Sequence, residues 1–278
     1  MQEIINYFAQ LSAEPGTFQE SEFSKIAKEF ILALEQGRTR AASRDSDGNW
    51  QVNRWVKEGI LFLFKYGKLT DYSVDNNFNF FDKDTIPLQK FDITRNVRIV
   101  PGGSSIRCGS YIAPGVICMP PMYINIGAYV DEGTMVDSHA LVGTCAQIGR
   151  CVHISAASQI GGVLEPSGAR PVIIEDDVMI GGNCGVYEGV LIRRRAVLAS
   201  GVALTASSRI YDLVNNRIIK SDENNPLEVP ESAVLVPGSR AISSDFGKEH
   251  GLSISTPLIV KYRDSKTDAK TALNAALR

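Results

Sequence analysis

The segment INIGAYVDEGTMVDSHALVGTCAQIG, residues 124–149, carries an aliphatic residue at every sixth position. These residues are Ile124, Val130, Val136, Val142 and Ile148. A period of six matches neither the 3.6 residues of a helical turn nor the two-residue alternation of a simple strand. It is typical of a chain that turns a corner every six residues, so that one aliphatic side chain on each face points into a narrow prism.

The same period extends well beyond this segment. Three faces give a coil of about 18 residues, so residue i should lie beneath residue i+18 in a one-dimensional solenoid. Val100, Cys118, Val136 and Ile154 are then expected to form one inward column. The other predicted inward residues are Ile106, Ile112, Ile160, Ile174, Ile180, Val186, Ile192, Leu198, Leu204 and Ile210.

One interruption breaks the period between Ile160 and Ile174, where eight extra residues occur within GGVLEPSGARPV. Pro166, Gly168 and Pro171 predict a loop that leaves the prism at one corner. Long excursions from a rigid scaffold often close over ligands or neighbouring subunits. A neutral surface insertion is the alternative.

The sequence before the repeat has helical character. Apolar residues at helical spacing run from Phe23 to Leu34, with Gly37 as a C-terminal stop, and NRWVKEGILFLFKYG shows a similar pattern. After the repeat, Val229 and Leu235 recover the six-residue step, LSISTPLIVKY predicts a strand and DAKTALNAALR a short helix. The prism is therefore expected to lie between an N-terminal helical segment and a C-terminal segment that contains both strand and helix.

We therefore expect a mainly β protein in three parts. Residues 1–97 form an N-terminal helical domain, and residues 98–211 form the β-helix with its loop at 161–173. Residues 212–278 form a small C-terminal β/α extension that contains a further hexapeptide segment and a strand.

Composition excludes several classes of protein. The chain has 278 residues, 44% of them hydrophobic, and a net charge of -2, so it lacks the broad positive field that attracts nucleic acid or anionic lipid. Its strongest apolar run, GILFLF, is far shorter than the roughly 20 residues that span a bilayer. The N-terminus does not resemble a secretory signal. Five cysteines without a CxxC pair favour buried thiols in the cytoplasm, with a Cys nucleophile as the alternative.

Carboxylates follow the inward aliphatic residues and should lie at exposed corners. For Asp131 and Glu132, solvation or a hydrogen bond to the next coil is the favoured interpretation. Asp137 adjoins faces that are poor in charge, which suits contact with a neighbouring subunit, where it could accept a proton from an amine. Glu188, in GVYEGVL, lies on the next face some coils away, so we expect the two carboxylates to meet across a subunit boundary.

Arginines offer sites for an anionic substrate because the guanidinium group binds carboxylates through two hydrogen bonds. The candidates are Arg98, Arg107 and Arg209, and a surface ion pair is the alternative for each. The run at residues 193–195 could receive a nucleotide phosphate, although a solvated face is favoured.

Histidines raise the question of a metal. Zinc chemistry on a solenoid requires three converging ligands. His139 and His153 occupy different phases of the repeat, and His250 lies outside it, so we expect no metal site. His139 as a general base, and a solenoid metalloenzyme of the carbonic-anhydrase type, stay open as alternatives.

Several motifs together resemble the tetrahydrodipicolinate N-succinyltransferase family of lysine and diaminopimelate biosynthesis. They are YINIGAYVDEGTMVDSHALVGTCAQIG, IGGVLEPSGARPVIIEDD, SSRIYD and VRIVP. The resemblance covers nearly the whole chain. It implies a left-handed parallel β-helix, a homotrimer with active sites between subunits, and an acceptor that is L-2-amino-6-oxopimelate. It also implies succinyl-CoA as a cosubstrate, with no permanently bound cofactor.

The resemblance also implies roles for individual residues. Arg98 and Asp137 match family residues that contact substrate. Two positions depart from the family pattern: His139 stands where relatives commonly have Trp, and Gly185 stands where some relatives have Glu.

The expected reaction is direct acyl transfer. Asp137, with Glu188, deprotonates the acceptor ammonium, and Arg98 and Arg209 hold substrate carboxylates. The small residues Gly185, Ser200 and Gly201 are expected to accommodate the pantetheine arm of CoA. An N-acetyltransferase acting on the same acceptor and a purely structural β-helix are the remaining alternatives.

Overall fold

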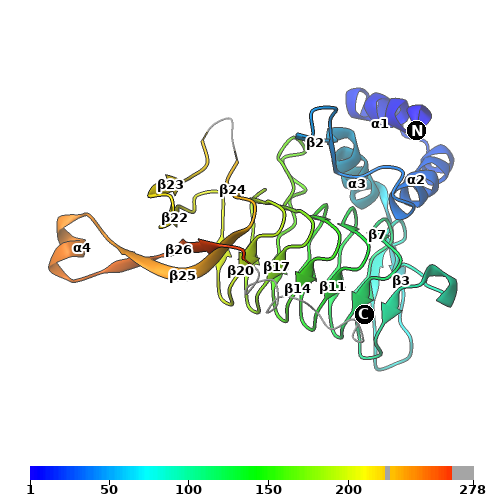
Figure 1. Ribbon diagram of the computed structural model, residues 1–278. Coiled ribbons are helices and arrows are strands. Elements are labelled where there is room, and N and C mark those ends of the chain that lie inside the picture. Colours follow the sequence, from blue (N-terminus) through cyan, green and yellow to red (C-terminus); the bar gives the residue numbers. More distant parts are fainter. Residues whose placement is uncertain (223–225, 265–278) are drawn as a thin grey trace.

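Figure 1 shows an elongated molecule in a computed structural model, which describes residues 1–222 and 226–264. A triangular prism of short strands forms the centre. Three helices lie at the end where the repeat begins, and a long β-hairpin projects from the other end. The short helix expected in residues 268–278 lies outside the described residues.

The prism has three faces, each a sheet of parallel strands. The first face contains β5 (Arg98–Ile99), β8 (Ile117–Cys118), β11 (Met135–Val136), β14 (His153–Ile154), β17 (Met179–Ile180), β20 (Val197–Leu198) and the start of β25 (Ala233–Ala241). The second contains β6 (Ser105–Ile106), β9 (Tyr123–Ile124), β12 (Leu141–Val142), β15 (Gln159–Ile160), β18 (Gly185–Val186) and β21 (Ala203–Leu204). The third contains β7 (Tyr111–Ile112), β10 (Tyr129–Val130), β13 (Gln147–Ile148), β16 (Ile173–Ile174), β19 (Leu191–Ile192) and β24 (Glu228–Val229).

The stacking register confirms the 18-residue coil over most of the prism. Val136 pairs with Cys118 on one side and Ile154 on the other, and all three side chains are fully buried. The prediction for Val100 was wrong, because Ile99 is the partner of Cys118. The strand β5 is the first of the stack and is paired only with β8, so its register relative to the repeat can shift by one residue.

The last coil also differs from the expectation. Ile210 is buried, but the partner of Ile192 is Val229, so the chain leaves the prism after β21 and returns at β24. Leu235 then pairs with Leu198, which confirms that the later segment completes the stack.

The prism turns its corners with left-handed residues. Gly109, Gly127 and Gly133 have φ between 68° and 74°, and His139 at an equivalent position has φ 61°. This conformation is accessible to glycine without a steric penalty. At Gly127 the absence of a side chain has a second role, because an added Cβ would lie 2.7 Å from Ile60 Cδ1.

The N-terminal helices form a second core at one corner of the prism. They are α1 (Gln2–Ala13), α2 (Glu20–Glu35) and α3 (Arg54–Tyr66), with a 3-10 turn η1 (Pro15–Thr17) between the first two. The predicted stripe from Phe23 to Leu34 is buried, and Gly37 follows α2 with φ 66°. Cys108, Ile126 and Cys145 of the prism belong to this core. None of the helices in the described ranges is both long and apolar enough to cross a bilayer.

A short hairpin covers the third face. It consists of β1 (Ala42–Arg44) and β2 (Trp50–Val52), and its Ala42 and Trp50 pack against Ile173 and Leu191. A second hairpin of β3 (Leu69–Asp71) and β4 (Phe81–Lys83) and the 3-10 turn η2 (Ile93–Arg95) lead the chain into β5. The N-terminal segment is thus wrapped against two sides of the prism.

The C-terminal segment extends the first face. The strand β25 (Ala233–Ala241) leaves the prism and pairs antiparallel with β26 (Ser253–Tyr262), with α4 (Asp245–Glu249) at the tip (Figure 1). Between β21 and β24 the chain forms an excursion that contains β22 (Ile210–Asp212) and β23 (Arg217–Ile219), which pair antiparallel. The strand predicted from LSISTPLIVKY is confirmed as β26.

We expect Val136→Asp to prevent folding. The side chain points into the prism between Cys118 and Ile154, and water does not reach it. Burying a carboxylate among aliphatic groups opposes folding by an amount comparable to a domain's whole stability of about 5–15 kcal/mol. Soluble yield and thermal unfolding by circular dichroism measure the effect.

The control is His139→Asp, which adds the same group at an exposed corner whose left-handed conformation Asp tolerates. It should melt close to the native protein. A native melting curve for Val136→Asp would contradict the prism.

Candidate functional site

Asp137 lies at the corner that connects the first face to the second, directly after β11. Its Oδ1 accepts a hydrogen bond of 2.7 Å from the backbone N–H of Ser138. Its Oδ2 lies 3.7 Å from Nε2 of His153, which points outward from the adjacent strand β14. The two side chains are 29% and 15% exposed, so both are partly shielded from water. A carboxylate next to an imidazole can hold an ammonium group and pass on its proton.

The contact between Asp137 and His153 was missed at the level of sequence, where His153 was considered only as a metal ligand. A usable signal was present. His153 follows Met135 by 18 residues, and the two are strand partners. The period that predicts the inward columns therefore also stacks outward neighbours, and Asp137 lies two residues after Met135.

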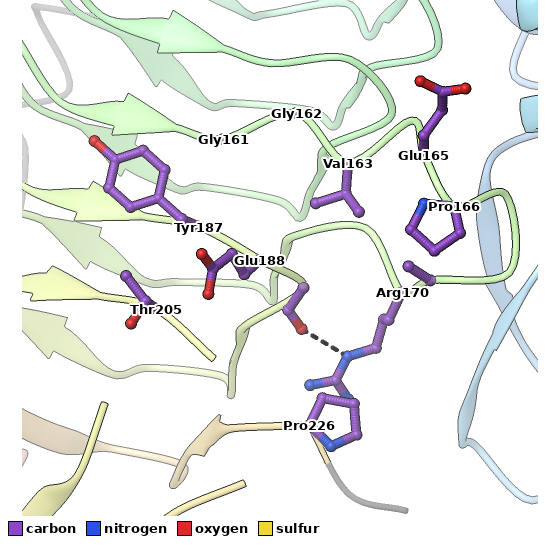
Figure 2. A pocket seen from close by; sticks show the side chains of 12 residues that line it. Gly161, Gly162, Val163, Glu165, Pro166, Arg170, Tyr187, Glu188, Thr205 and Pro226 are labelled. Carbon is purple, nitrogen blue, oxygen red and sulfur yellow. Dashed lines mark hydrogen bonds between the residues drawn. The ribbon is translucent and has the colours of Figure 1, made fainter. Parts of the chain in front are cut away.

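Glu188 lies at the next corner, between the second and third faces, beside a cavity of about 770 Å³ (Figure 2). Its Oε2 accepts a hydrogen bond of 2.9 Å from the backbone N–H of Ala206. The side chain lies between Tyr187 and Thr205, whereas Glu165 points away at the far side of the cavity. The cavity is lined by Gly161, Gly162, Val163, Glu165, Pro166, Ala169, Arg170, Tyr187, Glu188, Gly189, Thr205 and Pro226.

The predicted loop forms one wall of this cavity. It spans residues 161–172, one residue fewer than expected, because Ile173 already belongs to β16. Arg170 is its only cationic residue and is committed to the protein itself. Its Nε donates to Gly189 O at 2.8 Å, Nη1 to Glu228 Oε1 at 3.0 Å and Nη2 to Leu227 O at 3.2 Å. Burial lowers the pKa of this guanidinium group, and the Glu228 carboxylate opposes that shift. Arg170 therefore holds the Glu188 corner in place, and three of its five N–H groups are committed to contacts within the chain.

Tyr187 lies flat against two glycines of the second face. A Cβ added at Gly185 would lie 2.4 Å from the Tyr187 ring, and one at Gly161 would lie 2.8 Å from it. Gly185, expected to contact CoA, is thus covered by this ring. A pantetheine arm reaches Gly185 only if Tyr187 moves.

Asp137 and Glu188 do not meet within one chain. Asp137 precedes β12, and Glu188 follows β18, two strands further along the second face. Strands in a sheet are about 4.8 Å apart, so the two corners are separated by about 10 Å along the prism and also by the width of a face. Asp137 is absent from the residues that line the 770 Å³ cavity.

The remaining predicted residues occupy separate positions. Arg98 opens β5 on the first face, two strands from β11. Ser200 and Gly201 are exposed at the corner after β20. This corner lies on the same edge of the prism as the corner that holds Asp137, because β20 and β11 belong to the same face. Arg209 is exposed, and its carbonyl accepts a hydrogen bond of 2.7 Å from Thr256.

Other charged residues form ion pairs, which was the alternative interpretation for Arg107, whereas a solvated face had been favoured for residues 193–195. Arg150 lies 3.7 Å from Asp131, and Arg107 pairs with Asp82. In the basic run, Arg193 binds Glu228 at 2.7 Å and Arg194 lies 3.5 Å from Glu231. Within the described residues these arginines have protein partners, so a nucleotide phosphate would have to compete with them.

The cysteine alternative fails for the buried thiols. Burial raises the pKa of Cys108, Cys118 and Cys145 to about 12, so their reactive thiolate forms are scarce near neutral pH. Across residues 1–222 and 226–264, no three His, Cys, Asp or Glu side chains converge in a way that could hold a metal ion.

Comparison with known proteins identifies two matching family models. Residues 1–66 match the N-terminal model of tetrahydrodipicolinate N-succinyltransferase, and residues 171–206 match the hexapeptide repeat of succinyl-transferase. The solved structure of a protein described as a 2,3,4,5-tetrahydropyridine-2-carboxylate N-succinyltransferase from Campylobacter jejuni aligns over 84% of this chain and 62% of that chain, at 16% identity and a TM-score of 0.44. A score this low supports no conclusion.

Relatives of closely similar length carry one name, 2,3,4,5-tetrahydropyridine-2,6-dicarboxylate N-succinyltransferase. The protein from Nitrobacter winogradskyi is 44% identical over 88% of this chain and 86% of its own length. The protein from Azoarcus sp. is 46% identical over 90% of this chain and 88% of its own. Identity of this extent over both chains means that the chain belongs to the tetrahydrodipicolinate N-succinyltransferase family.

Proposed function

We propose that the protein transfers the succinyl group of succinyl-CoA to the amine of L-2-amino-6-oxopimelate, in lysine and diaminopimelate biosynthesis. The observation that carries this proposal is the 44–46% identity to N-succinyltransferases over nearly the whole chain. The partly shielded Asp137–His153 pair and the acidic Glu188 cavity support it, because an amine acceptor needs a group that takes its proton.

The reaction is a direct transfer. A carboxylate takes a proton from the acceptor ammonium, and the free amine nitrogen then attacks the thioester carbonyl carbon. A C–N bond forms, the C–S bond breaks, and CoA leaves as a thiolate that is then protonated. Backbone N–H groups at the prism corners stabilise the oxyanion. Aligning the two substrates should supply much of the rate.

We assign Asp137 as the base, with His153 beside it to receive or return the proton. Glu188 orients the ammonium from the other side. Arg98 and Arg209 hold carboxylates of the substrates. Because Arg170 already makes three contacts within the chain, we assign the succinyl carboxylate to a cation other than Arg170.

We further propose that the protein is a homotrimer and acts in the cytoplasm. A homotrimer brings the Asp137 corner of one subunit next to the Glu188 corner of another, which fits the separation of these corners within one chain. The prism coils left-handed, although connections between parallel strands are usually right-handed. The N-terminal part of the chain ends at residue 97, and the middle part of the chain ends at residue 211.

CoA lies along the exposed small residues Ser200 and Gly201, and it reaches Gly185 after the Tyr187 ring moves. An odd number of cysteines without a CxxC pair fits the cytoplasm.

A donor comparison tests the function. We expect the purified protein to acylate L-2-amino-6-oxopimelate from succinyl-CoA with a kcat/KM at least about tenfold above that for acetyl-CoA, because an ion pair to the second carboxylate adds about that much selectivity. Release of free thiol measures the rate. A preference for acetyl-CoA would make the protein an N-acetyltransferase instead, and no transfer from either donor would leave a structural β-helix.

Asp137→Asn should fold and assemble but lose activity. The amide keeps the size of the side chain and the acceptor for Ser138 N–H, yet it cannot take a proton. Loss of a general base lowers kcat by about 10²–10⁴-fold. Steady-state kinetics measure the loss, and thermal unfolding and size-exclusion chromatography check the fold. Near-native turnover would remove Asp137 from this role.

Mixing two inactive variants tests the shared site. Asp137→Asn and Glu188→Gln subunits are unfolded together and refolded at equal concentration. If each site takes Asp137 from one subunit and Glu188 from the next, every mixed trimer holds one site with both carboxylates, and random mixing restores about a quarter of native activity. A site contained in one chain restores none. Full activity of Glu188→Gln alone would show that Glu188 has no catalytic part.

A further inference from the structure

Lys57 is a buried ammonium group that the proposed chemistry does not use. It lies on α3, its side chain is 0% exposed, and burial lowers its pKa. Within the described residues no carboxylate is paired with it. An apolar side chain of similar length would fill this space without the cost of burying a charge. The presence of an amine here therefore calls for a reason beyond packing.

The partners of Lys57 lie in the loop of residues 161–172. Its Nζ donates to Ala169 O at 2.7 Å and to Pro166 O at 3.3 Å. Pro166 and Ala169 both line the 770 Å³ cavity, where Figure 2 shows Pro166 at the turn of the loop. Lys57 thus reaches from the N-terminal helices to the backbone on the outer side of the cavity wall.

The same loop is held from its other side by Arg170. The three hydrogen bonds of Arg170 join the loop to Gly189, next to Glu188, and to the strand β24. The base of the loop is closely packed, since a Cβ on Gly162 would lie 2.7 Å from Thr144 N. Between these ends, Lys57 provides two hydrogen bonds to the loop backbone, and Ser167 donates one to Glu58.

The helix that carries Lys57 is itself fixed against the prism. Ile60, one turn further along α3, packs on Gly127 and is fully buried. Cys145, at the following coil of the same corner, also lies in this core. The anchor point of Lys57 is therefore rigid, and a loop that moves away from α3 has to break the Lys57 contacts.

We propose that Lys57 is a positioning residue for the acyl-transfer cavity, which it shapes by holding the backbone of residues 166–169 against α3. It makes the N-terminal helices part of the reaction site without any contact to substrate. The expected change in KM rests on the proposed function, whereas the hold of Lys57 on the loop does not. Lys57 acts on the loop, and the loop closes the cavity over the acceptor amine.

Lys57→Met tests the proposal in the full-length assembly. Met fills a similar volume without the donor, so the melting temperature should stay near the native value. We expect the KM for the acceptor to rise about tenfold, because the two hydrogen bonds from Lys57 that hold the loop in its binding position are lost. The kcat should change less than about threefold, since the proton-accepting groups are untouched.

Two further variants separate positioning from general destabilisation. Lys57→Arg retains a charged donor and should recover part of the native KM, which also keeps the test decisive if Lys57→Met fails to fold. Glu58→Gln is the matched control. Glu58 lies next to Lys57 on α3 and accepts a hydrogen bond of 3.3 Å from Ser167, but its side chain is 25% exposed, whereas Lys57 is fully buried. Its substitution should leave KM within about twofold, because Gln keeps the acceptor oxygen.

Hydrogen exchange of the loop gives a readout independent of activity. The amides of residues 163–170, including Ala169 N–H, which donates to Pro166 O at 2.9 Å, should exchange at least about tenfold faster in Lys57→Met. Unchanged exchange would show that Lys57 does not hold the loop. Faster exchange with a native KM would show that the loop does not shape the site.

The two proposals fail in different ways. If the native protein transfers no acyl group, the proposed function falls, while the exchange measurement still decides whether Lys57 holds the loop. If transfer is normal and Lys57→Met matches the native protein in KM and in loop exchange, only the role of Lys57 falls. A parallel loss of kcat and melting temperature that Lys57→Arg does not reverse would reduce Lys57 to a structural residue.

Discussion

The whole molecule depends on the stacking of aliphatic side chains inside a narrow prism. Each coil can bury its inward residues only against the coils above and below, so no single turn is stable alone. The column of Cys118, Val136 and Ile154 shows the result, with every side chain withdrawn from water. Backbone hydrogen bonds between successive coils follow from the same register. A scaffold of this kind is rigid along its axis and places its corners at regular intervals.

Rigid corners explain why the chemically useful groups occur where they do. A residue one or two positions after an inward aliphatic residue lies in a tight turn at a corner, as Asp137 after Val136 and Glu188 after Val186 both do. The prism cannot bring such groups together within one chain, because different corners face different directions. It can bring them together only with an excursion from a corner or with another subunit. The loop of residues 161–172 is the excursion, and the proposed trimer is the second means.

The N-terminal segment adapts this generic scaffold to one site. Its helices pack on a prism corner through Ile60 and Gly127, and its β1–β2 hairpin covers the third face. Lys57 then extends from the helices to the loop, at the expense of a buried charge. A segment that shares no repeat with the prism is in this way connected to the cavity beside Glu188.

The sequence by itself determined the repeat, the triangular stack, the helices at one end and the exposed carboxylates, because these depend on periodicity and on neighbours at known spacing. It misplaced Val100, since the first strand of the stack has only one partner to set its register, and Ile210, since the chain leaves the prism after β21 and β24 completes that face. The contact of His153 with Asp137 follows from the same 18-residue period, although it was not drawn from the sequence. Only the tertiary structure decided that Tyr187 covers Gly185 and that Lys57 holds the loop. The first depends on the direction that one side chain takes, and the second on the packing of the N-terminal helices against a loop that lies 109–112 residues further along the chain.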